Sequence, residues 1–158
     1  MRGYITKCSC RLIANMLSYD KNMNQQIGDY MTYEIIFYER ENGKSEIWDF
    51  LEELRQKSVK NKNARIQYKQ ILLYIELLQN NGTLLPNNIT KHIEDNIWEL
   101  RPGSNRIFYF YFDKNTFVLL HSFRKKTQKT PSREIAKAKS ERDDYLSRKK
   151  VDDYENME

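Results

Sequence analysis

The sequence predicts an α+β fold in which helices pack on one face of a largely antiparallel sheet, in the element order βααβββα. Three observations predict this class. Apolar residues recur with helical spacing between residues 45 and 79. Short aromatic-rich runs separated by turn residues occupy residues 96 to 123, which is typical of antiparallel strands. A Thr-Pro pair at residues 130 and 131 then indicates the start of a last helix.

The first half of the chain is expected to form one strand and two helices. Residues 33–38, with the sequence Tyr-Glu-Ile-Ile-Phe-Tyr, are typical of a strand. Ser45 can cap a helix that runs to about Lys57 and carries apolar residues on one face (Ile47, Phe50, Leu51 and Leu54). A second helix, from about Lys62 to Gln79, carries a similar stripe and ends before an Asn-Asn-Gly sequence. Both stripes are expected to form core.

The second half is expected to form three strands and a helix. The strands lie near Asn96–Arg101, Arg106–Phe112 and Thr116–Phe123, and residues 113–115 supply the tight turn between the last two. The final helix is expected to begin with Thr130 as its cap and to run to about Leu146.

Length and composition indicate one compact core. The chain has 158 residues, of which 39% are hydrophobic. Residues 1–30 show no sustained helical or strand periodicity, so we expect the domain to span residues 31–149. The preceding residues are then a poorly structured extension, or the product of a misassigned start. Residues 150–158 contain one base and four acids and are expected to form a frayed acidic tail.

Charge favours a polyanionic partner, although the same excess is often only a solvated surface. The chain has a formal net charge of +5 and a pI near 9.1. The excess is concentrated between residues 114 and 150, which include 12 basic and 4 acidic side chains. Together with an aromatic content of 13%, this pattern indicates nucleic acid.

Several other classes of protein are disfavoured. No apolar run approaches the roughly 20 residues that cross a bilayer, so a cytoplasmic protein without membrane contact is expected. Cys8 and Cys10 are one residue apart and are interpreted as free thiols. The chain has no glycine-rich phosphate loop, no HExxH motif and no carboxylate cluster, so neither a cofactor nor a metal site is predicted.

Alternation along the strand at residues 106–112 predicts a functional face. Arg106 is hard to bury without a partner, so the opposite face is assigned to the core (Ile107, Tyr109 and Tyr111, with Trp98 and Leu100). The face of Arg106 then gathers Glu99 and Arg101 on exposed phenylalanines, and Phe108 or Phe110 can stack on unpaired bases. In the alternative interpretation, both arginines are surface charges or pair with Glu99.

A second candidate group follows at the end of the last strand. His121 is either a hydrogen-bonded core residue or a catalytic one, and Arg124, Lys125 and Lys126 come directly after it. RNA cleavage requires a held nucleotide, proton transfer and stabilisation of negative charge on the phosphorane. Arg and Lys suit the last task, whereas His or Glu suits proton transfer, without a metal ion.

Residues 31–148 resemble the phage-derived, HigB-type branch of the RelE/ParE toxin superfamily. The matching segments are Lys91-His92, residues 97–102 with their Trp-Glu-Leu-Arg-Pro sequence, Asn105-Arg106-Ile107, residues 120–123, the Lys-Lys-Thr-Gln-Lys-Thr-Pro sequence at 125–131, and residues 134–136. The resemblance implies a type II toxin that cuts mRNA on the translating ribosome by attack of the ribose 2′-hydroxyl. It also implies silencing by a helix-turn-helix, HigA-like antitoxin.

The resemblance also implies roles for residues. Arg106 matches a strand arginine that contacts the scissile phosphate, and Lys125 or Lys126 matches the basic residue after the last strand. Glu99 stands where RelE has a catalytic lysine, and RelE's C-terminal catalytic tyrosine has no clear counterpart, so His121 or Glu99 is the substitute. The predicted catalytic residues are therefore Glu99, Arg106, His121, Lys125 and Lys126. The predicted RNA-binding residues are Lys91, Arg101, Arg124, Lys129, Lys137, Lys139 and Arg142.

Two other functions fit parts of the same sequence. A ParE-like toxin that targets DNA gyrase would share the fold without an RNase site. A module that binds nucleic acid or antitoxin without catalysis is the other alternative. The cationic residues at 101, 106, 125 and 126, together with His121, favour the endoribonuclease.

Overall fold

The structure, a computed structural model, describes residues 32–113 and 115–155. The predicted N-terminal extension, residues 1–30, lies outside these ranges. The elements are β1 (Glu34–Phe37), α2 (Glu46–Ser58), α3 (Lys62–Asn81), a 3-10 turn (Gly82–Leu84), β2 (Thr90–Glu94), β3 (Ile97–Leu100), β4 (Asn105–Phe112), β5 (Thr116–Arg124) and α4 (Ser132–Glu155). The strands form one sheet in the order β1-β5-β4-β3-β2. Only the β1–β5 pair is parallel among these neighbours, which confirms the predicted α+β class.

Helices α2 and α3 form as their sequences predict. The backbone N–H of Trp48 donates to Ser45 Oγ, and the backbone N–H of Ala64 donates to Asn61 Oδ1, so each helix has a side-chain cap. Their apolar stripes are buried, which confirms that these stripes form core (Ile47, Leu51 and Leu54 in α2; Ile71, Leu72, Ile75 and Leu78 in α3).

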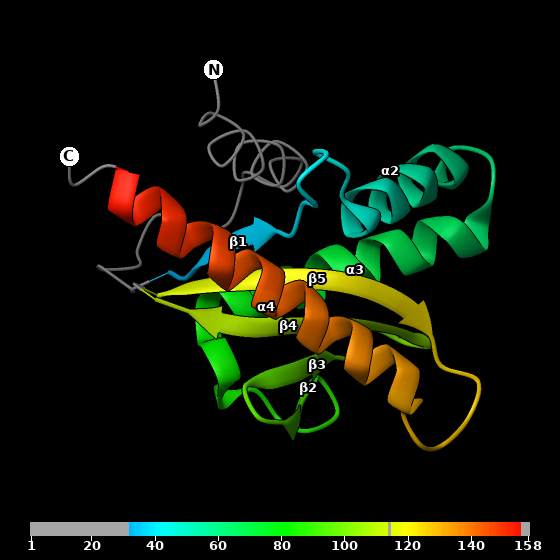
Figure 1. The fold of residues 1–158 in the computed structure, drawn as a ribbon. Helices are drawn as coiled ribbons and strands as arrows, with labels where there is room; N and C mark the ends of the chain where they lie inside the picture. The colour runs from blue at the N-terminus through cyan, green and yellow to red at the C-terminus, as the bar shows by residue number, and fades with distance from the viewer. Residues whose placement is uncertain (1–31, 114, 156–158) are drawn as a thin grey trace, which may run out of the picture.

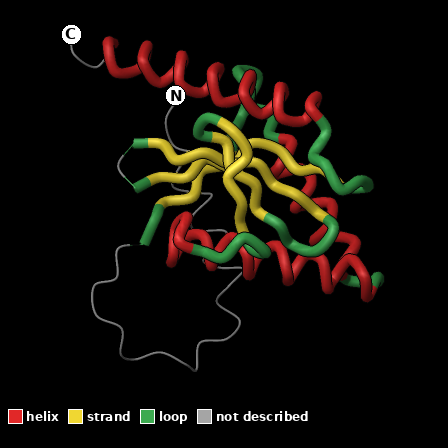
Figure 2. Tube along the Cα trace, turned by 90° about the horizontal axis from the view of Figure 1, so that it is seen from below, coloured by secondary structure: helices red, strands yellow, loops and turns green. Residues whose placement is uncertain are grey.

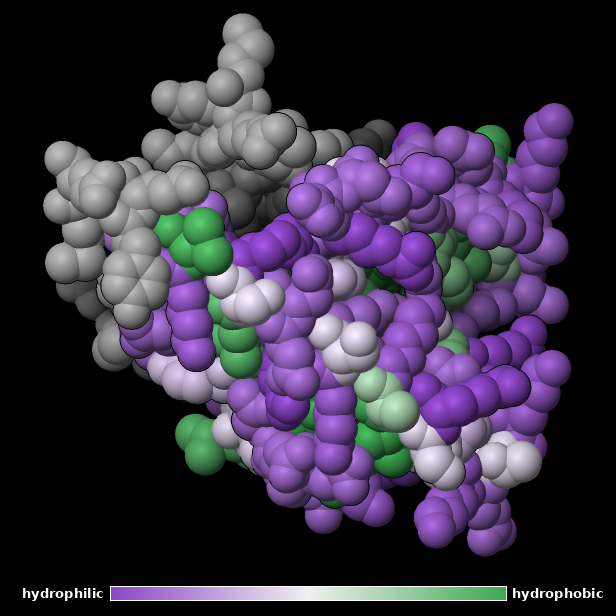
Figure 3. Space-filling model, in the orientation of Figure 1, coloured by the Kyte–Doolittle hydropathy of each residue, from purple (hydrophilic) through white to green (hydrophobic). Residues whose placement is uncertain are grey.

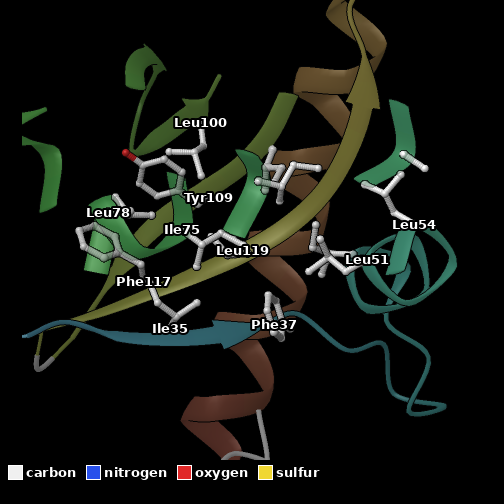
Figure 4. Packing of buried hydrophobic residues seen from close by; sticks show 14 residues of the cluster. Ile35, Phe37, Leu51, Leu54, Ile75, Leu78, Leu100, Tyr109, Phe117 and Leu119 are labelled. Carbon is white, nitrogen blue, oxygen red and sulfur yellow. The ribbon is translucent and has the colours of Figure 1, made fainter. Parts of the chain in front are cut away.

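One face of the sheet packs against α2 and α3. Figure 4 shows Ile75 and Leu78 of α3 pointing toward Tyr109, Phe117 and Leu119 of the sheet. The predicted core face of β3 and β4 is confirmed for four of its five residues. Leu100, Ile107 and Tyr109 are fully buried, and Trp98 is partly buried against the same cluster. Tyr111 was assigned to this core, but it is 46% exposed because it lies near the end of β4.

The opposite face of the sheet is covered by α4, so the prediction that all helices lie on one face is wrong. In Figure 1, α4 crosses the strands, and in Figure 2 the sheet lies between α4 and the other helices. Ala138 and Tyr145 of α4 bury this face in a second apolar cluster (Phe108, Phe110, Val118 and Leu120). Phe108 and Phe110 are fully buried there, and the prediction that they are exposed to stack on bases is wrong.

One strand, one helix cap and one helix end differ from the predictions. Strand β2 was not predicted, because its Thr-Lys-His-Ile-Glu sequence is mostly polar, as suits an edge strand. The Thr130 hydroxyl donates to Glu99 rather than capping α4. Helix α4 continues through Glu155, beyond its predicted end at Leu146, so residues 150–155 are helical instead of a frayed tail.

Strand β5 contains a bulge that affects the site. Ile107 of β4 pairs with Ser122, whereas Tyr109 pairs with Leu119. One residue of β4 therefore faces two residues of β5, Leu120 and His121. This extra residue turns both Leu120 and His121 toward α4.

None of the helices within residues 32–113 and 115–155 has both the length and the apolar character needed to cross a membrane.

Candidate functional site

An open pocket of about 470 Å³ lies between the β2–β3 edge of the sheet and the segment that joins β5 to α4. Its lining includes four basic side chains (Lys91, Arg101, Lys125 and Lys129). Glu94 and Glu99 are its acidic members. The register explains part of this set, because Lys91 of β2 pairs with Glu99 of β3 and Glu99 pairs with Phe108 of β4. Their side chains therefore lie on the same face of the sheet.

Glu99 is the buried centre of the site. It is 1% exposed, and its Oε1 lies 3.4 Å from Arg101 Nε and 3.3 Å from Arg106 Nε. Its Oε2 accepts a hydrogen bond of 3.0 Å from Thr130 Oγ1. Neither arginine Nε has an aligned hydrogen-bond partner among the described residues, so both are charge contacts. The interpretation in which both arginines pair with Glu99 is confirmed.

Arg106 is held from two sides. Its Nη1 donates to the backbone carbonyls of Gly103 and Asn105, at 2.6 and 2.7 Å. Burial lowers the pKa of Arg106, and Arg101 adds to this effect, whereas Glu99 opposes it. Two guanidinium groups thus share one carboxylate, and this cluster keeps an excess of positive charge at the side of the pocket.

Lys125 joins this cluster from the end of β5. Its backbone N–H donates to the Ser104 carbonyl at 2.9 Å, which fixes the chain beside the turn between β3 and β4. Burial lowers the pKa of Lys125, the neighbouring charges of Arg106, Arg101 and Lys91 lower it further, and Glu99 raises it. A lysine with a lowered pKa can transfer a proton more easily than a solvated one.

The structure places His121 outside this pocket. It is 1% exposed, with Nδ1 2.7 Å from Glu141 Oε2 and Nε2 3.0 Å from Glu134 Oε2, both in α4. Its ring also packs edge-on against Phe108, with centroids 5.4 Å apart. Of the two interpretations left open by the sequence, this geometry is that of a hydrogen-bonded core residue.

The other predicted residues fall into two groups. Arg124 and Lys126 are exposed at the end of β5, on either side of Lys125 in the sequence, and Lys129 is an exposed residue of the pocket lining. In contrast, Lys137 pairs with Glu46 of α2, and Lys139 lies 2.9 Å from both Glu94 and Asp95. Arg142 donates to Asn96 Oδ1 at 2.6 Å and lies 2.8 Å from Asp143.

These contacts locate the basic surface. Helix α4 contains seven basic and seven acidic side chains and is therefore electrically neutral. Figure 3 shows that the face carrying α4 is mostly hydrophilic. The unbalanced positive charge belongs to the pocket and to the segment after β5, rather than to the helix.

Sequence reasoning missed three residues that shape the site. Thr130 binds Glu99, Ile135 lines the pocket, and Glu141 binds His121. The Glu134 and Glu141 spacing of seven residues was the available signal, because it puts two carboxylates on one helix face. No group of metal-ligating side chains is found in residues 32–113 and 115–155.

Fold and site together define a small α+β protein with a basic pocket suited to a polyanion. The family model "Phage derived protein Gp49-like (DUF891)" matches residues 49–143, more than half of the chain, and the protein belongs to this family. No protein of curated function matches it. A chain of the heterotetrameric YoeB–YefM toxin–antitoxin complex from Staphylococcus aureus is similar, with 14% identity and a TM-score of 0.43. That match covers 60% of this chain and 98% of the other.

Proposed function

We propose that this protein is the toxin of a type II toxin–antitoxin pair and cleaves mRNA on the ribosome without a metal ion. The observation that carries the proposal is the buried Glu99 shared by Arg101 and Arg106, next to a basic pocket that Glu99, Arg101 and Lys125 line. Membership of the Gp49-like family and the sequence resemblance to HigB-type toxins support it. A HigA-like helix-turn-helix antitoxin is the proposed partner.

The pocket can stabilise the transition state of RNA cleavage. A phosphate bound by the two guanidinium groups is attacked by the adjacent 2′-hydroxyl, whose proton passes to water. The bond from phosphorus to the 5′ oxygen breaks, and protonated Lys125 donates a proton to that oxygen. Arg106 and Arg101 offset the negative charge that develops on the phosphorane. Glu99 keeps both guanidinium groups in place, which assigns it an orienting role.

Lys126, Lys129, Lys91 and Arg124 are proposed to bind the RNA backbone on either side of the cleaved phosphate. Phosphate contacts of this kind orient the strand and do not read its bases.

The direct test is to map transcripts by primer extension after the full chain is induced in bacteria. We expect new 5′ ends inside translated regions, and we expect them to disappear when translation initiation is blocked. Growth arrest with intact transcripts would contradict the proposal and would favour a target such as gyrase, which a supercoiling assay on plasmid DNA detects.

The cleavage rate is expected to depend on the charge of Lys125. Because its pKa lies below the usual value for lysine, the protonated donor is present at lower pH and is lost as pH rises through this lowered pKa. Arg101→Gln removes a neighbouring positive charge and should move the alkaline limb of the kcat profile to higher pH. Glu99→Gln removes a negative charge and should move it to lower pH. Shifts in the same direction in both variants would contradict the role of Lys125.

Salt dependence distinguishes the two groups of basic residues. Replacing Lys91, Lys126 and Lys129 by Gln should flatten the slope of log affinity against log salt by roughly 0.7 per lost phosphate contact. Replacing Lys137, Lys139 and Arg142 should change the slope much less, since these side chains already contact Glu46, Glu94, Asp95 and Asn96. Binding of ribosomes carrying a short mRNA, measured over a salt series, checks this prediction. Equal slopes in the two triple variants would contradict it.

A further inference from the structure

His121 is the polar centre of the contact between α4 and the sheet. Both of its ring nitrogens face carboxylate oxygens of α4, at 2.7 Å from Glu141 and 3.0 Å from Glu134. An imidazole can satisfy two acceptors only by donating from both nitrogens, or by sharing a proton with one carboxyl group. Either way both ring nitrogens are occupied by carboxylates of α4, and His121 does not line the pocket.

The two glutamates occupy positions that an amphipathic helix normally gives to apolar residues. They lie seven residues apart on the inner face of α4, on either side of the fully buried Ala138. The side chain of Glu141 is 8% exposed and that of Glu134 is 18% exposed. Burying a carboxylate is unfavourable unless it is paired. His121 therefore adds a buried polar attachment between the N-terminal half of α4 and the sheet, beside the apolar contacts of Ala138 and Ile135.

The segment that leads into α4, together with Ile135 in the first turns of the helix, forms one wall of the pocket. Thr130, four residues before Glu134, donates to Glu99 at 3.0 Å. Ile135, next to Glu134, lines the pocket together with Gln128 and Lys129. A displacement of the first two turns of α4 would move this wall away from Glu99 and Arg101.

We infer that His121 is a positioning residue for the RNA pocket: by holding Glu134 and Glu141, it fixes the first turns of α4 so that residues 128–135 stay closed over Glu99. The inference rests on the proposed function, because it assigns RNA to this pocket. The anchoring of α4 is a separate property that can be measured without RNA.

The test compares wild-type protein with His121→Gln in hydrogen exchange and in cleavage kinetics. Glutamine has one donor group at its end in place of two ring nitrogens, so one carboxylate loses its hydrogen bond to β5. We expect faster exchange confined to residues 128–141, with the sheet and α3 unchanged. For cleavage of mRNA on ribosomes we expect a KM about tenfold higher, the size of effect that one lost hydrogen bond gives. The value of kcat should stay within about threefold, because Arg106 and Lys125 are untouched.

A compensating variant separates positioning from general stability. The double variant combines His121→Gln with Glu134→Gln. The side-chain amide group at position 134 can then donate to the side-chain carbonyl at position 121, while the amide group at position 121 donates to Glu141. Both contacts between β5 and α4 are therefore restored. Exchange and KM should recover toward wild type. Glu53→Gln in α2, where the glutamate is exposed and pairs with Lys57, is the matched control and should leave both unchanged. If His121→Gln does not fold, Glu134→Ala removes the more exposed partner and should show the same pattern more weakly.

The outcomes are distinct. Unchanged exchange in residues 128–141, or faster exchange over the whole sheet, would overturn the inference. A local change in exchange without any change in KM would also overturn it, because α4 would then be anchored without positioning the pocket. Absence of cleavage by the wild-type protein would instead reject the proposed function, and the exchange data would still decide the anchoring of α4.

Discussion

Arg106→Ala is expected to reduce cleavage of mRNA about 10²- to 10³-fold and to abolish growth arrest in cells. The size follows from the loss of a preorganised charge at the phosphate, which typically costs this much in rate. The fold should survive, because Glu99 keeps Arg101 and the Thr130 hydroxyl as partners. A cost of about 1–3 kcal/mol in unfolding free energy is expected, since a buried carboxylate loses one of its contacts.

Two further variants test whether the loss at Arg106 is specific. Arg106→Lys keeps the charge but not the planar fork, so it should recover only part of the rate. Arg55→Ala removes an arginine that pairs with Glu52 on the exposed surface of α2, and it should leave cleavage unchanged. Urea unfolding verifies that each variant is folded. Cleavage at the wild-type rate by folded Arg106→Ala protein would remove Arg106 from the site.

The sequence predicts the helices better than the full sheet. Helices α2 and α3 carry apolar stripes and side-chain caps, which are local signals. Strand β2 carries no such signal, because the edge of a sheet tolerates charged residues. The length of α4 was underestimated for a related reason. Its last turns contain mostly charged residues, and their helical state follows from continuity with the packed segment around Tyr145.

The sequence also predicts only part of the site, because only part of it follows from a local pattern. Strand alternation puts Glu99 and Arg106 on one face, and the structure confirms this, because β3 and β4 pair without a bulge there. Alternation would put His121 on the same face as Phe117 and Leu119. The bulge in β5 instead turns His121 toward α4. No local feature of the sequence predicts this bulge. The spacing of Glu134 and Glu141 puts both carboxylates on one face of α4, but their pairing with His121 depends on this bulge.

The arrangement of charges explains why the amino-acid composition alone did not locate the basic surface. Residues 114–150 are strongly basic, yet the cations of α4 are offset by acids in the same helix and in β2 and α2. The cations that remain unbalanced surround Glu99, which is itself the only acid buried in that cluster among the described residues. Positive charge is thus concentrated where a single phosphate can be bound, which fits cleavage better than nonspecific coating of RNA.

Phe108→Ala is expected to lower the unfolding free energy by about 3–5 kcal/mol, the usual cost of removing a buried phenylalanine. Phe108 is fully buried beneath α4 and stacks on Phe123, with ring centroids 5.2 Å apart. Tyr111→Ala is the comparison, and it should cost far less because that side chain is 46% exposed. Urea unfolding of the three proteins checks both expectations.

A milder substitution decides between a core role and base stacking for Phe108. Phe108→Leu keeps an apolar side chain in the core and should cost under about 1.5 kcal/mol. Because the ring is buried, this variant should bind RNA as wild type does. If Phe108 stacked on a base, the loss of the ring would weaken binding by about 1–3 kcal/mol while the protein stayed folded. RNA affinity measured on folded Phe108→Leu protein therefore tests whether α4 covers this face of the sheet in the RNA-binding state.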